Sequence, residues 1–180
     1  MTLLRTARLT LRPWRETDKP VFAALNADGE VAADLGGPLS RTASDAKLDR
    51  YRAAFDRHGF SRLAIEDSQQ VFVGYAGVMP SQPDHPLGPH IDIGWRLARA
   101  FWGKGYATEA ARAVLEDVFA RPDIAEVLAY TSSDNARSQA VMARLGMRRD
   151  PLLDFDAADG DASWHGLVWV AEMRQAVTEV

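Results

Sequence analysis

Apolar and polar residues alternate along several short segments of the chain, which is the pattern of half-buried β-strands. Leu9 and Leu11 alternate with Thr10 and Arg12, and Pro13 follows them, which predicts a first strand near a sheet edge. Longer apolar, β-branched runs predict further strands, and the polar tip between the first two of these runs predicts a hairpin. The predicted strands cover residues 8–14, 60–67, 71–80, 90–97, 125–132, 147–155 and 163–174.

Four other segments have the features of helices. The clearest covers 107–119, where Ala107, Ala110, Ala111 and Val114 begin an apolar stripe at helical spacing. Capping residues and glycine turns delimit the other three segments. The expected caps are Thr17 or Asp18 for the first helix, Thr42 or Ser44 for the second and Asp134 or Asn135 for the last, with Gly59 and Gly146 ending the second and the last.

The order of these elements predicts the fold class. It runs strand, two helices, three strands, helix, strand, helix and two strands, with no repeat, low-complexity segment or linker. Such an order is typical of a mixed sheet covered by helices, an α/β fold of the mixed α+β kind. Because 180 residues suit a single domain, we expect one domain over residues 1–180.

Composition and charge narrow the function. The formal net charge of -4 and the isoelectric point near 5.6 argue against nucleic-acid binding, which requires a concentrated basic face, and favour a small cationic substrate. The absence of cysteine excludes disulfides, thiolate zinc sites and a cysteine nucleophile. No apolar run predicts a membrane span, and the first residues lack the continuous apolar core of a signal peptide, so we expect a cytoplasmic protein.

The segment "WGKGYATEA", residues 102–110, places two glycines where a strand turns into a helix. Free backbone N–H groups and the helix dipole converge on anions at such a turn, and glycine lets a phosphate approach closely, although a plain turn would need the same glycines. The spacing excludes a P-loop, because Lys104 lies between the glycines. A dinucleotide fingerprint is a weak alternative, because Thr108 occupies its third small position.

Four motifs in this order resemble the GNAT acyltransferases, in particular the RimJ/RimL-type branch of ribosomal-protein N-terminal acetyltransferases. They are "RLTLRPW" at 8–14, "IDIGWRL" at 91–97, "FWGKGYATEA" at 101–110 and "NARSQAVMARLGM" at 135–147. The family signature Q/R-x-x-G-x-G/A is matched at Gly105 and Ala107, whereas Trp102 stands where Gln or Arg is expected. The resemblance covers almost the whole chain. It implies a central, mostly antiparallel, splayed mixed sheet of about six to seven strands flanked by helices.

The resemblance also implies how acetyl-CoA binds. The amides of residues 102–107 would hold its pyrophosphate, and its pantetheine arm would pair with the end of the strand 91–97, in a gap beside 126–132. Lys104 would neutralise phosphate or point into solvent, and Asn135 would cap its helix, contact the coenzyme or do both. The implied coenzyme-binding residues are Leu97, Ala98, Arg99, Trp102, Gly103, Lys104, Gly105, Tyr106, Ala107, Asn135 and Ser138.

Acyl transfer to an amine needs help with protons, because an alkylamine with a pKa near ~10 is mostly protonated at neutral pH. Asp92 stands where relatives often carry glutamate, and it would act as a base through a water, anchor the amine or be a plain strand residue. Ser138 would donate a proton to the leaving thiolate, or its hydroxyl would bond the helix backbone. Tyr106 and Tyr130 are alternative acids.

Substrate contacts are assigned to Asp92, Trp95 and His90, with Trp95 as a wall of the acceptor pocket. His85 and His90 lack the fixed spacing of a metal site, and the acidic segment 154–161 misses the register of a calcium loop, so no metal is expected. Glu109 is interpreted as a first-turn charge that favours the helix dipole.

The sequence therefore predicts an acetyl-CoA-dependent N-acetyltransferase that acts on a primary amine, either a protein N-terminus or a small molecule, by direct attack in a ternary complex. A different short acyl-CoA, a non-catalytic CoA-binding module and, more distantly, an NAD-binding oxidoreductase are the alternatives. The resemblance makes a homodimer plausible. Neither the acceptor nor the acyl chain length follows from the sequence.

Overall fold

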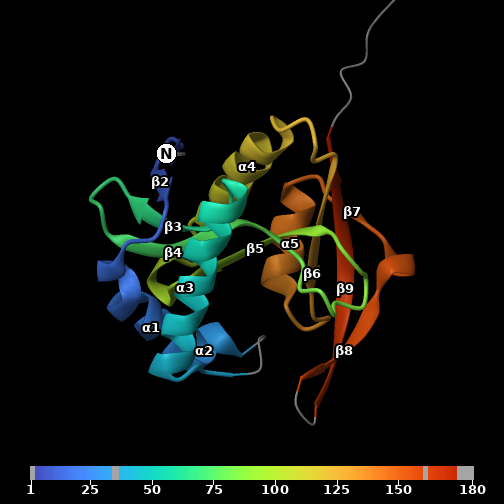
Figure 1. The fold of residues 1–180 in the computed structure, drawn as a ribbon, viewed down its shortest axis with the longest axis horizontal. Helices are drawn as coiled ribbons and strands as arrows, with labels where there is room; N and C mark the ends of the chain where they lie inside the picture. The colour runs from blue at the N-terminus through green and yellow to red at the C-terminus, as the bar shows by residue number, and fades with distance from the viewer. Residues whose placement is uncertain (1–2, 34–36, 160–161, 174–180) are drawn as a thin grey trace, which may run out of the picture.

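A computed structural model describes residues 3–33, 37–159 and 162–173, and within them one mixed sheet with helices on both faces (Figure 1). The helices are α1 (Lys19–Ala27), α2 (Gly29–Ala32), α3 (Arg41–His58), α4 (Tyr106–Phe119) and α5 (Ala136–Arg144), with 3-10 turns at Glu16–Asp18, Arg99–Phe101 and Pro151–Leu153. The strands are β1 (Leu4–Arg5), β2 (Leu9–Arg12), β3 (Arg62–Asp67), β4 (Phe72–Pro80), β5 (Ile91–Leu97), β6 (Glu126–Thr131), β7 (Arg148–Arg149), β8 (Phe155–Asp159) and β9 (Ala162–Glu172).

The strands follow the order β1-β2-β3-β4-β5-β6-β9-β7, and β8 pairs with β9 off this path. Each pair is antiparallel except β5 and β6, which run parallel and are joined at a single registered pair, Asp92 with Leu128. Beyond that pair the two strands diverge. The sheet is therefore mostly antiparallel and splayed between β5 and β6, as expected.

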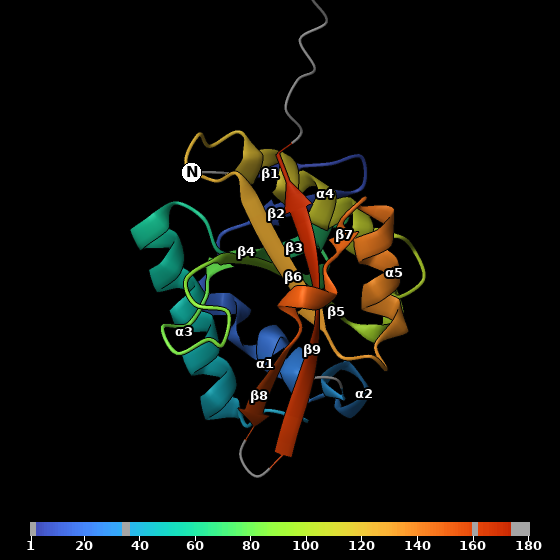
Figure 2. The same ribbon diagram turned by 90° about the vertical axis from the view of Figure 1, so that its right-hand side faces the viewer.

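The two faces of the sheet bury separate apolar clusters. On one face α4 contributes Ala110, Val114 and Val118 to a cluster with sheet residues such as Ile93 and Leu97. On the other face α1 and α3 cover a second cluster, which includes Phe22, Leu48, Tyr51, Tyr75 and Met79. Because successive side chains of a strand point to opposite faces, β5 directs Ile93, Trp95 and Leu97 to the α4 face and Asp92 and Arg96 to the α1/α3 face. Figure 2 shows α3 and α5 on opposite sides of β6 and β9.

Several element boundaries differ from the expected ones. The second long helix begins at Arg41, because the Ser40 hydroxyl caps it by accepting from the N–H of Ala43, 3.2 Å away. Ser44, an expected cap, is instead buried inside the helix and accepts from the Asn26 side chain at 3.0 Å. Asn135 caps α5 as one of the two expected residues.

The C-terminal strands also differ from those expected from the sequence. The segment 147–155, expected as one strand, is divided by the 3-10 turn Pro151–Leu153 into the short strand β7 and the start of β8. Asp150 caps this turn by accepting from the N–H of Leu152 at 3.2 Å, and proline cannot donate to a sheet ladder. This division, together with β1, gives the described sheet nine strands instead of six to seven.

Candidate active site

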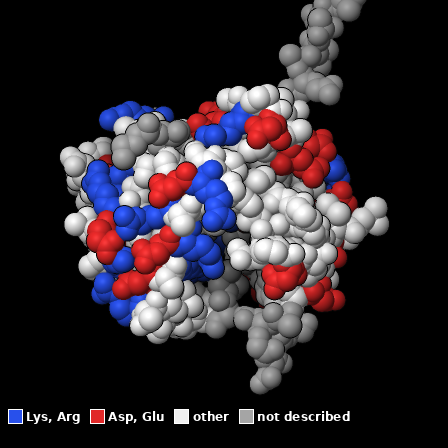
Figure 3. All heavy atoms as spheres, viewed as in Figure 1, with Lys and Arg blue, Asp and Glu red and all other residues white. Residues whose placement is uncertain are grey.

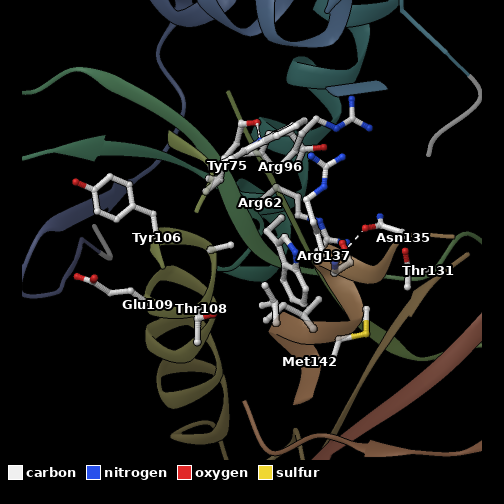
Figure 4. A pocket seen from close by; sticks show the side chains of 18 of the residues that line it. Arg62, Tyr75, Arg96, Tyr106, Thr108, Glu109, Thr131, Asn135, Arg137 and Met142 are labelled. Atoms are coloured by element: carbon white, nitrogen blue, oxygen red, sulfur yellow. Dashed lines mark hydrogen bonds between the residues drawn. The ribbon is translucent and has the colours of Figure 1, made fainter. Parts of the chain in front are cut away.

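A pocket of about 1250 Å³ opens at the splay between β5 and β6. Its walls come from α3, α4, α5 and the strands β3 to β6 (Figure 4). All the residues expected to bind the coenzyme line it except Ala98, Arg99 and Lys104. Asp92 and Trp95 line it as well, whereas His90 does not.

The N-terminus of α4 forms one end of the pocket. Gly103 and Gly105 have φ angles of 74° and 76°, a left-handed conformation that favours glycine, and nothing lies within 4 Å of a Cβ built on Gly103. No side chain caps the helix, and its first backbone bond runs from Glu109 to Gly105, so the N–H groups of Tyr106, Ala107 and Thr108 have no acceptor within the helix. These open donors and the glycine turn fit a phosphate group.

A clamp formed by Thr6 and Arg8, between β1 and β2, holds this turn in place. Glu109 accepts from the Thr6 hydroxyl at 2.6 Å and from the backbone and side chain of Arg8 at 2.9 and 2.7 Å. Arg8 also donates to the Lys104 carbonyl at 2.9 Å and lies 4.6 Å above the Tyr106 ring. Burial alone would raise the pKa of Glu109, but the hydrogen bonds from Thr6 and Arg8 lower it. Glu109 thus does more than favour the helix dipole, and no sequence pattern indicated its partner.

Trp102, which replaces the family's Gln or Arg, joins the turn to β5. Its indole N–H donates to the Leu97 carbonyl at 2.8 Å, and the Arg137 guanidinium lies 3.8 Å from the centre of its ring. Ala98 donates to the Val73 carbonyl at 3.0 Å, which places its backbone on the β4 side. Because the backbone groups of antiparallel neighbours alternate in direction, those of Trp95 and Leu97 face the gap toward β6. An extended ligand in this gap can therefore pair with β5.

Asp92 lies on the opposite face and forms a buried ion pair with Arg62. The Arg62 side chain starts on β3, crosses β4 at Gly77, covers Gly94 and donates to the Asp92 carboxylate. It also donates to the Gly77 and Asp92 carbonyls. Only Oδ2 of Asp92 takes part, and Oδ1 makes no hydrogen bond with any described residue. Arg62 was not expected at the site, although Gly94, which gives its guanidinium room, was visible in the sequence.

Two buried tyrosines lie beside this ion pair. The rings of Tyr51 and Tyr75 are 5.7 Å apart and line the pocket. Burial raises the pKa of Tyr51. Burial would also raise the pKa of Tyr75, but the positive charges of Arg96 and Lys47 and the Tyr51 hydroxyl bring it below the ordinary tyrosine value. Sequence reasoning assigned no role in the site to Tyr51, Tyr75, Arg96 or Lys47.

The expected proton donors lie at the α5 end of the pocket. The Asn135 side chain accepts from the N–H of Ser138 at 3.0 Å, so it caps the helix while lining the pocket. Ser138 also lines the pocket, and within the described residues its hydroxyl makes no hydrogen bond with the helix backbone. Tyr130 lines the pocket too, and burial raises its pKa well above that of a free tyrosine.

The expected acceptor contacts do not come together. Trp95 packs with the cluster under α4, on the face opposite Asp92. His90 lies outside the pocket, in a group of aromatic rings with His85, 4.6 Å away, and Tyr130, 5.9 Å away. Burial and the neighbouring His90 lower the pKa of His85. Among residues 3–33, 37–159 and 162–173, no three His, Cys, Asp or Glu side chains gather as a metal site, and no helix is long and apolar enough to cross a membrane.

Comparisons with known proteins agree with this geometry. The family described as "Acetyltransferase (GNAT) domain" matches residues 8–148. The FsC-acetyl coenzyme A-N(2)-transacetylase of Aspergillus fumigatus is 30% identical over 80% of this chain and 64% of its own length. An acetyltransferase structure from Agrobacterium tumefaciens has a TM-score of 0.79 and 29% identity, with 96% of this chain and 95% of the other covered.

A more distant neighbour shares the fold alone. It is a Salmonella typhimurium acetyltransferase that modifies the N-terminal serine of ribosomal protein L7/L12, with a TM-score of 0.77 and 18% identity over 95% of this chain and 99% of its own. The family takes its acetyl group from acetyl-CoA, and the open α4 N-terminus and the β5/β6 gap fit the phosphates and the extended arm of that molecule. The chain belongs to the GNAT acetyltransferase family and is an N-acetyltransferase that acts on amines.

Proposed function

We propose that the protein binds acetyl-CoA and a primary amine together and transfers the acetyl group directly to the amine. The observation that carries this proposal is the continuity of the pocket, which joins the α4 N-terminus, the β5/β6 gap and the buried Asp92 in one space. A ternary complex fits such a pocket. The chain contains no cysteine that could carry the acetyl group in a covalent intermediate.

The coenzyme would be held by three parts of the chain. The N–H groups of residues 103–107 would donate to its pyrophosphate, and the backbone of β5 from Trp95 to Leu97 would pair with its pantetheine arm. The N–H of Trp102, expected among the pyrophosphate donors, instead donates to the Arg99 carbonyl at 3.0 Å. Asn135 and Ser138, which line the pocket, would lie near its sulfur. The side chains of Ala98, Arg99 and Lys104 contribute less, since none of them lines the pocket. Acetyl-CoA supplies the activated acyl group.

Proton movements fall to residues of the pocket. Asp92 keeps Oδ1 available while Arg62 holds Oδ2, so its carboxylate accepts the proton of the amine through a water. The backbone N–H of Leu97 faces the gap and stabilises the developing oxyanion. Ser138 donates a proton to the departing thiolate, and Tyr130, which its raised pKa keeps protonated, is the alternative donor.

The proposal also covers the family branch, the oligomeric state and the cellular location. The RimJ/RimL-type branch is supported by the shared fold and by the four sequence motifs. A homodimer and a cytoplasmic location remain predictions of this proposal, the second because the reaction needs a supply of acetyl-CoA. Light scattering measures the first, and fractionation of cells that express the protein measures the second.

The decisive experiment is release of CoA thiol from acetyl-CoA with a panel of amines and N-terminal peptides. We expect turnover with at least one amine and none without an acceptor. Asp92→Asn should lower kcat sharply while acetyl-CoA still binds, and Ser138→Ala should lower kcat. Acetyl-CoA binding without turnover of any amine would instead indicate a non-catalytic CoA-binding module, and turnover only with longer acyl-CoA donors would change the assigned acyl group.

A further inference from the structure

Basic side chains line the part of the pocket that α3 and the sheet enclose. Lys47 and Arg50 come from α3, Arg62 from β3 and Arg96 from β5. Figure 3 shows Lys and Arg side chains gathered over α3 and beside the recess in the middle of that face. The chain as a whole is acidic, so this local surplus of positive charge is opposite to the net charge of -4.

The carboxylates in this part of the pocket already have partners. Asp92 pairs with Arg62, and Glu30 accepts from Arg99 at 2.6 Å. Lys47, Arg50 and Arg96 form no ion pair with any carboxylate among residues 3–33, 37–159 and 162–173. These three cations are therefore available to an anion that enters the pocket.

The three cations converge on one place. Lys47 and Arg96 each lie 5.9 Å from the centre of the Tyr75 ring, and Arg50 lies 5.9 Å from the centre of the Tyr51 ring. Since the two rings are 5.7 Å apart, all three charges lie around one pair of aromatic rings. Burial and the charges of Arg96 and Arg50 lower the pKa of Lys47, which is the effect of a site that lacks a counter-ion.

Arg96 is a buried cation with unused hydrogen-bonding capacity. Its side chain is on a residue only 7% exposed, and Nη1 donates to the Asn26 amide oxygen at 2.7 Å. Its Nε is buried and has no partner among the described residues. Its Nη2 makes no hydrogen bond with any described residue and, unlike Nε, is not fully buried, so it can donate to a carboxylate or phosphate that enters the pocket.

This cation cluster lies away from the expected phosphates of the coenzyme. Arg96 and Tyr75 project from the α1/α3 face of the sheet, whereas the N-terminus of α4 lies on the other face. Figure 4 shows Tyr75 and Arg96 on the opposite side of the pocket from Thr108. The β5/β6 gap lies between these two ends, so the cluster belongs to the side from which an acceptor reaches the acetyl group.

We propose that the acceptor amine carries an anionic group, a carboxylate or a phosphate, which Lys47, Arg50 and Arg96 bind while the amine faces Asp92. This inference rests on the proposed function and names the substrate class, a small acidic amine. The planar Arg96 guanidinium suits the oxygens of either anion. A polyamine acceptor would be repelled by the same three charges.

Matched pairs of acceptors test the proposal in the CoA-release assay. Amino acids are compared with their amides, and O-phosphoethanolamine with ethanolamine, which separates a carboxylate from a phosphate. We expect kcat/KM for at least one anionic acceptor to exceed that of its neutral partner by about tenfold or more, the effect of a charge-assisted hydrogen bond. Equal values, or a preference for the neutral partners or for spermidine, would overturn the proposal and leave the acetyltransferase function intact.

Variants test whether Lys47, Arg50 and Arg96 cause the preference for anionic acceptors. Lys47→Met should reduce the anionic-to-neutral ratio of kcat/KM by about tenfold through KM, while the dissociation constant of CoA stays within about twofold. Arg57→Gln, an exposed change on the same helix outside the pocket, is the control and should preserve the ratio. A tenfold loss of CoA affinity in Lys47→Met would instead assign the cluster to the coenzyme and contradict the proposal.

Binding of reaction products separates this inference from the proposed function. Calorimetry with N-acetylglycine and N-acetylglycinamide, in the presence of CoA, needs no turnover. Tighter binding of the acid by the wild type, lost in Lys47→Met, would support the anion site even if no acceptor were turned over. Equal binding of acid and amide would overturn the anion site whatever the outcome of the turnover assay.

Discussion

Arg62 on β3 reaches across β4 to the Asp92 carboxylate on β5, passing Gly77 and lying on Gly94. A Cβ on Gly94 would come within 3.0 Å of Arg62 Nη2, and a Cβ on Gly77 would come within 2.0 Å of the Ser61 carbonyl. Gly94 therefore makes room for the guanidinium, whereas Gly77 lets the β3 backbone at Ser61 and Arg62 approach β4 closely. The ion pair fixes the Asp92 carboxylate in the lining of the pocket.

Removal of one partner of this pair should destabilise the fold. Asp92→Asn leaves the buried Arg62 charge without a counter-ion, and Arg62→Met leaves Asp92 in the same condition, so each should cost about 3 kcal/mol or more of the free energy of unfolding. The double variant should cost clearly less than the sum of the two, which urea unfolding of all four proteins measures. Additive losses would show that the two side chains do not interact.

The glycine turn before α4 should be required for coenzyme binding. Gly103→Ala places a Cβ in a left-handed conformation, which costs roughly 1–2 kcal/mol of stability or shifts the turn. Gly88→Ala is the matched control, because Gly88 has a similar φ of 70°, equally open surroundings and no part in the pocket. Calorimetric titration with acetyl-CoA should show weaker binding only for Gly103→Ala. An equal loss of acetyl-CoA affinity in both variants would show that the weaker binding follows from lower overall stability.

The clamp of Arg8 on Glu109 should matter for the coenzyme as well. Glu109→Gln removes the charge that holds Arg8 against the Lys104 carbonyl, so the turn loses a support and acetyl-CoA should bind about three- to tenfold more weakly. Arg41→Gln removes an exposed ion pair with Asp45 and serves as the control. Unchanged coenzyme affinity in Glu109→Gln would show that the turn holds its shape without the clamp.

Stability in acid should depend on Asp18. This buried carboxylate bonds Arg12 at 2.7 and 2.9 Å and the N–H of Arg15 at 2.7 Å. Burial would raise its pKa, but these hydrogen bonds and the charge of Arg12 lower it below 3.8. Because the folded-state pKa is depressed, the stabilisation is present above the unfolded value and is lost as pH falls through the folded one.

The wild type should therefore lose stability as the pH drops below about 4, and Asp18→Asn should show a weaker dependence over that range, in urea unfolding measured from pH 2 to about 7. Asp45→Asn, a change to an exposed ion pair on α3, should keep the wild-type dependence. If the free energy of unfolding of Asp18→Asn changed with pH as steeply as that of the wild type, the acid sensitivity would belong to other carboxylates.

The sequence by itself determined most of the elements and the glycine turn before α4. Periodicity located the strands and helices because each depends on neighbouring residues, and the glycines at 103 and 105 indicated a left-handed turn because that conformation is a local property. The cap of α5 was likewise narrowed to Asp134 or Asn135 from their place before a helical stripe, and the structure has Asn135. Boundaries were missed where a cap such as Ser40 lay just outside the pattern.

Only the tertiary structure decided which side chains meet. Arg62 and Asp92 are 30 residues apart, and Arg8 and Glu109 are 101 apart, so their contacts depend on strand register and helix placement, which no local pattern encodes. The register of β3, β4 and β5 placed Gly94 against the Arg62 guanidinium. The same packing gathered Lys47, Arg50 and Arg96 over two tyrosines and made a cationic site in an acidic chain, because net charge says nothing about where charges lie.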